Sequence, residues 1–409
     1  MKPSASISTL HEQFAFLSTR SPDAVASIEA AHVQLRKFIS PFGLLQDYVG
    51  ELPTASDCAE CRPNAKGWWT PIENGPMFTG MWLAAVCARA EASGAAADRD
   101  LARVLADGLL LASRCSSVPG FIARGMGADP GVHYPVGSID QTLPWFYGLW
   151  RYCTSNIAEP SHADEVKMRM LEVACALERH GWKCPNEQPF ETEDCGDFLQ
   201  DGLPFRNAAH GLFLFRILAE LDPGRMPFYR SVATGKPSNS SLTRLEACGK
   251  GYEADIPKLP WIEPHLLWIY VAAQGCLKEL SKLEPDEPMF RAGLAANAAR
   301  ARCFLQLYEK YDNTTESPFR YGNWRNGYAW RPQKTLKESD AVSMTGKKEI
   351  LGTRKNVERD YMTAPLSAAA ICAFAGTERA AFEKLLRHYD WSTFNISEFF
   401  LAEVAWYAY

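Results

Sequence analysis

The sequence predicts an all-α fold, and more specifically a single (α/α)6 barrel in which helical hairpins form a closed toroid. Three observations support this prediction. Apolar residues recur at helical spacing along almost the whole chain, whereas strand-like alternation is rare and short. Strongly apolar segments alternate with charged, amphipathic ones, as expected for an inner ring of helices wrapped by an outer ring. Several apolar segments also begin with the same pattern, an acidic residue followed by proline.

The helical pattern divides the 409 residues into a series of elements. Helices are expected at 22–42, 76–92, 98–116, 138–154, 161–181, 204–221, 264–283, 287–312, 359–375, 378–389 and 397–409. The stretch 222–250 is expected to hold a further helix. All of these elements are assigned to one catalytic domain, residues 1–409, in which 313–355 is expected to be a long loop insertion near the active site.

The starts of the apolar helices share a chemistry. The acidic residue and its proline are Glu73 and Pro76, Asp140 and Pro144, Asp201 and Pro204, Glu263 and Pro264, and Asp360 and Pro365. Proline costs little in a first helical turn, and a carboxylate suits the positive end of the helix dipole. The first four starts recur every ~60–70 residues, long enough for a helical hairpin. In a closed ring such starts meet at one mouth, where site residues are expected. Generic helix-start chemistry is the alternative explanation.

Bulk properties exclude several classes of function. The net charge is −5, and no basic stripe with interleaved aromatics is present, so no nucleic-acid partner is expected. No apolar run approaches the ~20 residues that span a bilayer, so no membrane partner is expected. The N-terminus lacks a signal-peptide pattern and the cysteines are scattered, which favours a cytoplasmic setting, with export left open. Cys58 and Cys61 form one CxxC without a matching pair, and no phosphate or dinucleotide loop occurs. Neither a metal nor a cofactor is expected.

The loops before the apolar helices are rich in residue types that bind sugars. Sugar rings stack on aromatic side chains, and their hydroxyls pair with carboxylates, amides and guanidinium groups. The candidate substrate-binding residues are Trp69, Arg124, His133, Gln141, Trp145, Arg206, Asn207, His210, Trp324 and Tyr361. The alternative for the tryptophans is a structural role in closing the barrel ends.

Asp140 is the leading catalytic candidate, with Glu73 as its partner. Segment 138–141 (SIDQ) also fits a capping box, but either interpretation places the Asp140 carboxylate at the barrel mouth. Glu73 and Asp140 begin neighbouring inner helices, packed ~8–10 Å apart. Such a spacing is compatible with a retaining or an inverting glycosidase. A simple capping role is the alternative for Asp140.

Arg206, Asn207 and His210 lie in the opening turns of the helix that follows Pro204. Arg206 and His210 are four residues apart and therefore share a helix face. This face is suited to a sugar carboxylate or to sugar hydroxyls. For His210 alone, a hydrogen-bonded core histidine is the alternative.

Four short segments carry a family resemblance: 73–80 (ENGPMFTG), 120–125 (GFIARG), 138–141 (SIDQ) and 147–150 (YGLW). They resemble the helix-start segments of six-hairpin glycosidases, and loosely those of unsaturated glucuronyl hydrolases and their rhamnogalacturonyl relatives. The similarity is one of architecture over most of the chain, with sharper motifs between Glu73 and Trp150. It implies an (α/α)6 barrel, a site at the inner-helix starts, no cofactor, and an aspartate acid/base that maps onto Asp140.

The sequence therefore predicts a glycoside hydrolase for a small, uronate-bearing oligosaccharide, with Arg124 or Arg206 as the carboxylate anchor. A sugar epimerase or isomerase on the same barrel, with His210 as base, is the first alternative. A polysaccharide lyase using Tyr321 or Tyr361 is the second. A helical-repeat binding scaffold without activity is the third.

Overall fold

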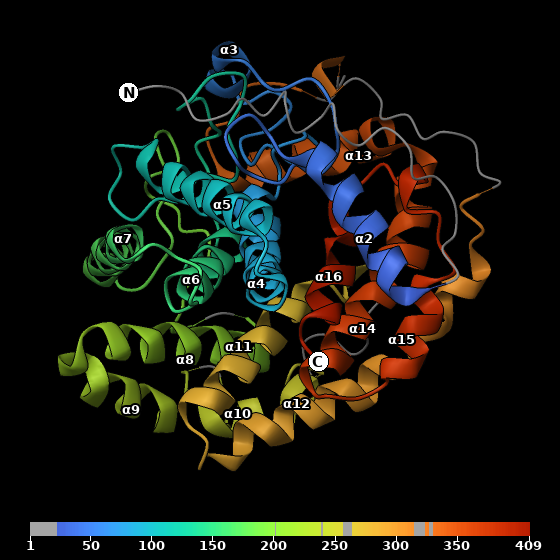
Figure 1. The fold of residues 1–409 in the computed structure, drawn as a ribbon. Helices are drawn as coiled ribbons and strands as arrows, with labels where there is room; N and C mark the ends of the chain where they lie inside the picture. Colours follow the sequence, from blue (N-terminus) through green and yellow to red (C-terminus); the bar gives the residue numbers. More distant parts are fainter. Residues whose placement is uncertain (1–22, 201, 239, 257–263, 315–323, 327–329) are drawn as a thin grey trace.

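The computed structural model describes residues 23–409 apart from 201, 239, 257–263, 315–323 and 327–329 (Figure 1). Over these residues the chain is helical and contains no β-strand; its isolated bridges join Ile39 to Leu45 and Lys183 to Asp197. The predicted all-α class is therefore confirmed. Asp201, Glu263 and Tyr321 lie outside the described residues.

The apolar helices contact one another in cyclic order, each one touching the next and the last touching the first. In that order they are α4 (Gly75–Ser93), α6 (Ile139–Cys153), α8 (Pro204–Leu221), α11 (Ile269–Leu283), α14 (Ala364–Phe374) and α16 (Leu401–Trp406). Every residue of α14 is buried, as expected for an element covered on all sides. We refer to this set as the inner helices.

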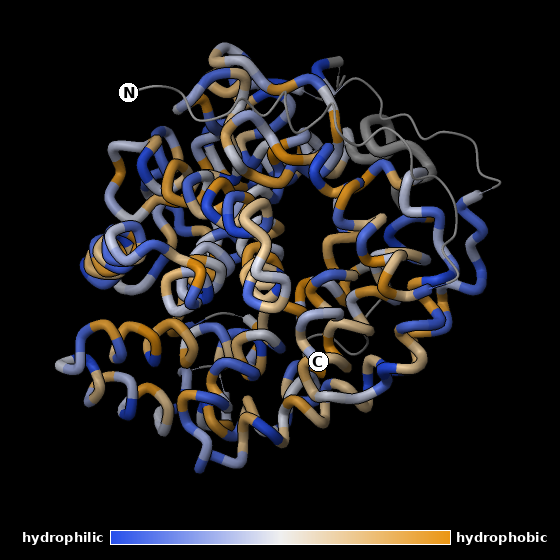
Figure 2. Tube along the Cα trace, viewed as in Figure 1, coloured by the Kyte–Doolittle hydropathy of each residue, from blue (hydrophilic) through white to orange (hydrophobic). Residues whose placement is uncertain are grey.

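The other helices pack against the outside of this set. They are α2 (Ala24–Leu35), α5 (Ala96–Arg114), α7 (Pro160–Arg179), α9 (Met226–Thr234), α10 (Arg244–Lys250), α12 (Pro288–Ala301) and α15 (Arg379–Leu386). In Figure 1, α7, α9 and α15 lie at the periphery while α4 and α16 lie towards the middle. Hydrophilic residues recur along these outer helices in Figure 2. The alternation of apolar and amphipathic helices predicted from the sequence is thus present in the structure.

The region 313–355 differs from its prediction. It was expected to be a loop, but α13 (Leu336–Glu358) occupies its second half. The helix begins with a cap that the sequence contains: the Thr335 hydroxyl accepts the Glu338 N–H, and the Glu338 carboxylate accepts the Lys334 N–H. α13 is charged and has no wide apolar stripe, so hydrophobic periodicity did not reveal it.

Asp360 precedes α14 as predicted, but it lies in a helical segment and not in a loop that leads into the helix. Arg359–Thr363 form a π-helical turn that joins α13 directly to α14, and the Ala364 N–H bonds to the Arg359 carbonyl. In a π turn each backbone N–H bonds to the carbonyl five residues earlier instead of four. Pro365 has no backbone N–H, so it needs no acceptor from this turn. Pro365 thus lies in the first turn of α14, as predicted, but the segment before this helix is a π turn and not a loop. A smaller difference concerns 222–250, where α9 and α10 stand in place of one helix.

Two glycines set the distance between α4 and α6. A Cβ atom on Gly80 would lie 2.0 Å from the Pro144 carbonyl oxygen, and one on Gly148 would lie 2.6 Å from the Gly80 Cα. No side chain fits at either position, so the two helices cross with their backbones in contact. This crossing fixes how the starts of α4 and α6 lie relative to each other.

A buried polar network joins the last inner helix to the first. The fully buried Glu403 of α16 accepts hydrogen bonds from Trp82 Nε1 of α4, at 3.1 Å, and is bonded to His32 Nδ1 of α2, at 2.8 Å. On α4, Arg89 pairs with the buried Asp98 of α5 at 3.0 Å. Both carboxylates therefore have partners, which offsets the cost of burying their charge.

We expect Gly80→Ala to destabilise the protein because the added methyl group meets backbone atoms that cannot move aside. The expected loss is about 1–3 kcal/mol in the free energy of unfolding, measured by urea denaturation. Gly202→Ala is the control, since a Cβ at Gly202 meets no atom within 4 Å. Equal stability of the two variants would contradict the proposed role of the crossing.

Candidate functional site

The starts of α4 and α6 are joined by the buried side chain of Gln141. Its Oε1 accepts the Met77 N–H at 3.1 Å, and its Nε2 donates to Asn74 Oδ1 at 3.2 Å. Asn74 donates its backbone N–H and its Nδ2 to the Asp47 carboxylate, both at 2.8 Å. Gln141 was predicted to bind substrate, but these bonds use its amide to hold the two helix starts together.

The remaining helix starts meet at the same end. The Asp47 carbonyl accepts the Ser397 N–H at 2.9 Å, just before α16, and Thr363 Oγ1 donates to Glu398 at 2.6 Å, which links the starts of α14 and α16. The Phe78 ring of α4 lies 5.1 Å from Phe400 and 6.3 Å from Trp268, at the starts of α16 and α11. The predicted convergence of these starts is therefore confirmed.

The start of α6 faces the start of α8 through an ion pair between Asp140 and Arg206. The Asp140 side chain is 38% exposed, whereas that of Arg206 is only 12% exposed. Burial lowers the pKa of Arg206, but a guanidinium group remains charged in proteins. A solvent-accessible carboxylate thus lies against a buried cation, at the end where the helix starts meet.

His210 lies on α8 one turn beyond Arg206, and both of its ring nitrogens are buried without a hydrogen-bond partner. Burial, helped by the charge of Arg206, holds the pKa of His210 well below its usual value, so the imidazole is neutral. Arg206 Nε and Ser138 Oγ also lack partners. The interpretation of His210 as a hydrogen-bonded core histidine is therefore wrong. Buried polar atoms without partners are costly and rare, so this α6–α8 sector is unusual.

Asp255, which the sequence analysis did not single out, belongs to the same sector. It is fully buried and accepts hydrogen bonds from the Phe205 N–H at 2.7 Å and from Tyr270 Oη at 3.1 Å. Burial raises its pKa to about 6, although these bonds and the nearby Arg206 act in the opposite direction. Asp255 caps α8 from outside that helix. In the sequence Pro257 follows Asp255, but the next apolar helix, α11, begins only at Ile269, so the acid was not recognised as a helix start.

Glu73 has a structural partner. Its Oε2 accepts the Trp69 N–H at 2.8 Å, and Glu73 as a whole is only 8% exposed. Trp69 has a φ of +72°, a conformation that a bulky residue adopts only when the surroundings enforce it. Arg124 is buried beside this loop and donates to the Glu73 carbonyl at 3.4 Å. No hydrogen bond or ion pair joins Glu73 to Asp140 among the described contacts.

Three predicted binding residues have other roles. Trp145 is fully buried and donates its indole N–H to the Leu109 carbonyl of the outer helix α5, at 2.6 Å, so it is a core residue. Asn207 donates to the Asp197 carbonyl at 2.9 Å and holds the loop before α8.

His133, the third of these residues, is bonded to Glu187 at 3.0 Å. Burial opposes the charge of His133, but hydrogen bonds with Cys115 and Glu187 raise its pKa to about 10.

The insertion before α14 lies against the loop that leads to Glu73. The indole N–H of Trp69 donates to the Ser343 carbonyl of α13 at 3.0 Å, and Lys66 pairs with Asp340 at 2.5 Å. Trp324 donates to the Glu51 carbonyl at 3.0 Å, and Trp69 and Trp324 share one small apolar cluster. Tyr361 is partly buried, and its carbonyl accepts the Tyr389 hydroxyl. Trp69 and Trp324 are thus near the helix starts, and both are hydrogen-bonded to neighbouring loops.

The described part of the chain contains no group of three or more His, Cys, Asp and Glu side chains arranged to hold a metal ion. None of its helices combines the length and apolarity that crossing a bilayer requires. Comparison with protein-family models, curated proteins and solved structures gave no match.

We expect Asp255→Asn to flatten the pH dependence of stability. The folded protein holds a proton on Asp255 up to a pKa of about 6, whereas an unfolded aspartate releases it near 3.9. The contribution of Asp255 to the free energy of unfolding therefore decreases as pH rises from about 4 to about 6, by roughly 3 kcal/mol. Urea denaturation at several pH values measures this slope. Asp164→Asn, on the exposed face of α7, is the control, and an unchanged slope in Asp255→Asn would contradict the assignment.

Proposed function

We propose that the chain is a glycoside hydrolase of the (α/α)6-barrel type that acts on a small, uronate-bearing oligosaccharide. The observation that carries the proposal is the Asp140–Arg206 pair, an exposed carboxylate on a buried guanidinium group at the starts of neighbouring inner helices. The closed order of contacts among α4, α6, α8, α11, α14 and α16 supports the barrel, since each is also covered by an outer helix or segment.

Asp140 is assigned as the general acid/base. In hydrolysis a carboxylic acid gives a proton to the glycosidic oxygen as the bond between that oxygen and the anomeric carbon breaks. The resulting carboxylate then takes a proton from the water molecule whose oxygen bonds to the anomeric carbon. The 38% exposure of the Asp140 side chain leaves room for a glycosidic oxygen to approach it. Its place on the first turn of α6 fixes its direction.

Arg206 is assigned as the anchor for the sugar carboxylate. A guanidinium group has five N–H donors, and Arg206 uses one terminal nitrogen for Asp140 while its Nε has no partner. A uronate carboxylate satisfies that unused donor and is held next to the acid/base. Arg124 lies deeper beside the Glu73 loop, so it is the weaker of the two anchor candidates.

In this proposal Glu73 remains the second carboxylate of the site, because it lies at the start of the neighbouring inner helix, α4. Its hydrogen bond to the Trp69 N–H ties the carboxylate to the loop that carries two tryptophans. Glu73 therefore positions Trp69, and the proton transfers are assigned to Asp140 alone.

A sugar epimerase or isomerase is the second candidate, because His210 is neutral and its ring nitrogens are unpartnered. A neutral imidazole can take a proton from a carbon next to a carbonyl group, which is the first step of such a reaction. Interconversion of free monosaccharides, abolished by His210→Ala while glycosides stay intact, would replace the hydrolase proposal. Products that absorb in the ultraviolet would instead identify a lyase.

We expect Asp140→Asn to lower kcat by roughly 10²–10⁴-fold on any uronate glycoside that the wild type cleaves. The amide keeps the shape of the side chain and cannot transfer the proton. Reducing-end release from nitrophenyl glucuronides and galacturonides measures the effect. Asp164→Asn is the control. Full activity of Asp140→Asn on a cleaved substrate would show that the acid/base is another residue.

We expect Arg206→Gln to raise KM for uronate glycosides while leaving the KM for the matching neutral glycosides nearly unchanged. The change removes the cation that the proposal assigns to the sugar carboxylate. An equal rise for both classes of substrate would show that Arg206 acts through the fold rather than through recognition of the anion.

A further inference from the structure

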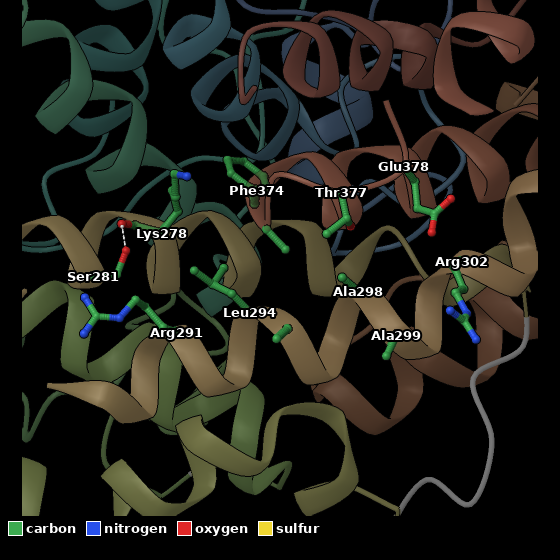
Figure 3. Close-up of a pocket in the computed structure, with 12 residues that line it drawn as sticks. Lys278, Ser281, Arg291, Leu294, Ala298, Ala299, Arg302, Phe374, Thr377 and Glu378 are labelled. Atoms are coloured by element: carbon green, nitrogen blue, oxygen red, sulfur yellow. Dashed lines mark hydrogen bonds between the residues drawn. The ribbon is translucent and has the colours of Figure 1, made fainter. Parts of the chain in front are cut away.

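A groove runs along the outer helix α12, away from the helix starts. It has a volume of about 420 Å³ and lies between α12, the second half of α11 and the end of α14 (Figure 3). Phe374, which lines it, is the last residue of α14. The groove is therefore separate from the Asp140 site, which lies where the inner helices begin.

Small side chains make the room for this groove. Ala295, Ala298 and Ala299 leave space along α12, and the apolar walls come from Leu294 and Phe374. The volume falls within the range of about 300–1,000 Å³ that is typical of ligand pockets. The groove extends from Arg291 to Arg302, eleven residues along the helix or roughly 16 Å. It is thus suited to an elongated molecule with an apolar body.

Cations lie at both ends of the groove. Figure 3 shows Lys278 and Arg291 at one end, and Arg302 with Glu378 at the other. The chain as a whole has a net charge of −5, so the positive excess here is local. Such a local field attracts anions that the rest of the surface repels.

These cations differ from their neighbours in having no carboxylate partner. On the same elements, Lys282 pairs with Glu279 at 2.7 Å and Arg300 pairs with Glu253. Among the ion pairs of the described residues, none includes Lys278, Arg291 or Arg302; the only bond of these side chains is from Arg291 to the Pro285 carbonyl, at 2.7 Å. Burial, together with the charge of Lys282, lowers the pKa of Lys278. An anion placed beside Lys278 would reverse this effect.

We propose that this groove binds an elongated organic anion, with its acidic group between Lys278 and Arg291 and its apolar body over Leu294 and Phe374. The site is independent of the hydrolase proposal, and a simple monosaccharide uronate lacks the apolar body that it requires. Glu378 at the far end disfavours a second acidic group on the ligand.

Isothermal titration calorimetry of the full chain with decanoate tests this proposal. We expect decanoate to bind with a Kd below about 1 mM. Decanol, which has the same apolar body without the charge, is expected to bind at least tenfold more weakly. Acetate, which has the charge without the body, is expected not to bind. Lys278→Gln and Arg291→Gln are each expected to weaken decanoate binding roughly tenfold. Ala295→Trp, at an exposed position on α12, fills the groove and is expected to abolish it.

Lys282→Gln is the matched control, because it removes a cation from the same helix without changing the groove. Decanoate binding that is lost equally in Lys282→Gln and Lys278→Gln, or that decanol matches, would show non-specific association and overturn the proposal. Absence of binding up to about 1 mM would also overturn it. Thermal unfolding of each variant confirms that it is folded, and activity at the Asp140 site is expected to stay unchanged in all of them.

Discussion

The contact between Gly80 and Gly148 sets the spacing on which the candidate site depends. With the backbones of α4 and α6 touching, the side chain of Gln141 reaches both Asn74 and the Met77 N–H. Successive residues of a helix point about 100° apart around its axis. With Gln141 directed at α4, the preceding residue, Asp140, is directed towards α8 and Arg206. A packing constraint in the core thus determines where an exposed carboxylate points.

Two buried polar regions of the protein differ in how well they are satisfied. Around Glu403 every carboxylate oxygen has a donor, and the bonds join α2, α4 and α16. In Arg206 and His210, by contrast, several buried nitrogen atoms have no hydrogen-bond partner. Satisfied networks stabilise a fold, whereas unsatisfied groups cost stability and persist where a ligand or bound water later completes them. Single unpartnered atoms also lie beside other helix starts, at Arg124 Nε and Ser397 Oγ. The α6–α8 sector differs because Arg206 and His210 place three such nitrogen atoms on one face of α8.

The sequence predicted the fold class, most helix positions and the meeting of the helix starts, because these follow from hydrophobic periodicity and from local cap chemistry. It failed where tertiary context decides. Asp360 lies in a π turn, just before the α14 start that holds Pro365, because α13 continues directly into α14, and no local pattern shows that. Trp145 packs outward on α5 rather than into the site, because its direction depends on how α6 is rotated about its own axis in the fold. Asp255 caps a helix fifty residues earlier in the chain, a pairing that only the folded structure reveals.

The Glu403 network also has a consequence for how the protein folds during its synthesis. Its partners His32 and Trp82 precede it in the sequence by 371 and 321 residues, so they leave the ribosome long before Glu403 does. Until then α4 has an uncovered apolar side and the buried His32 and Trp82 have no carboxylate. Contacts between residues so distant in sequence are slow to form, and incomplete chains with exposed apolar surface tend to aggregate. A nascent chain of this protein is thus expected to need protection by chaperones until α16 has been synthesised.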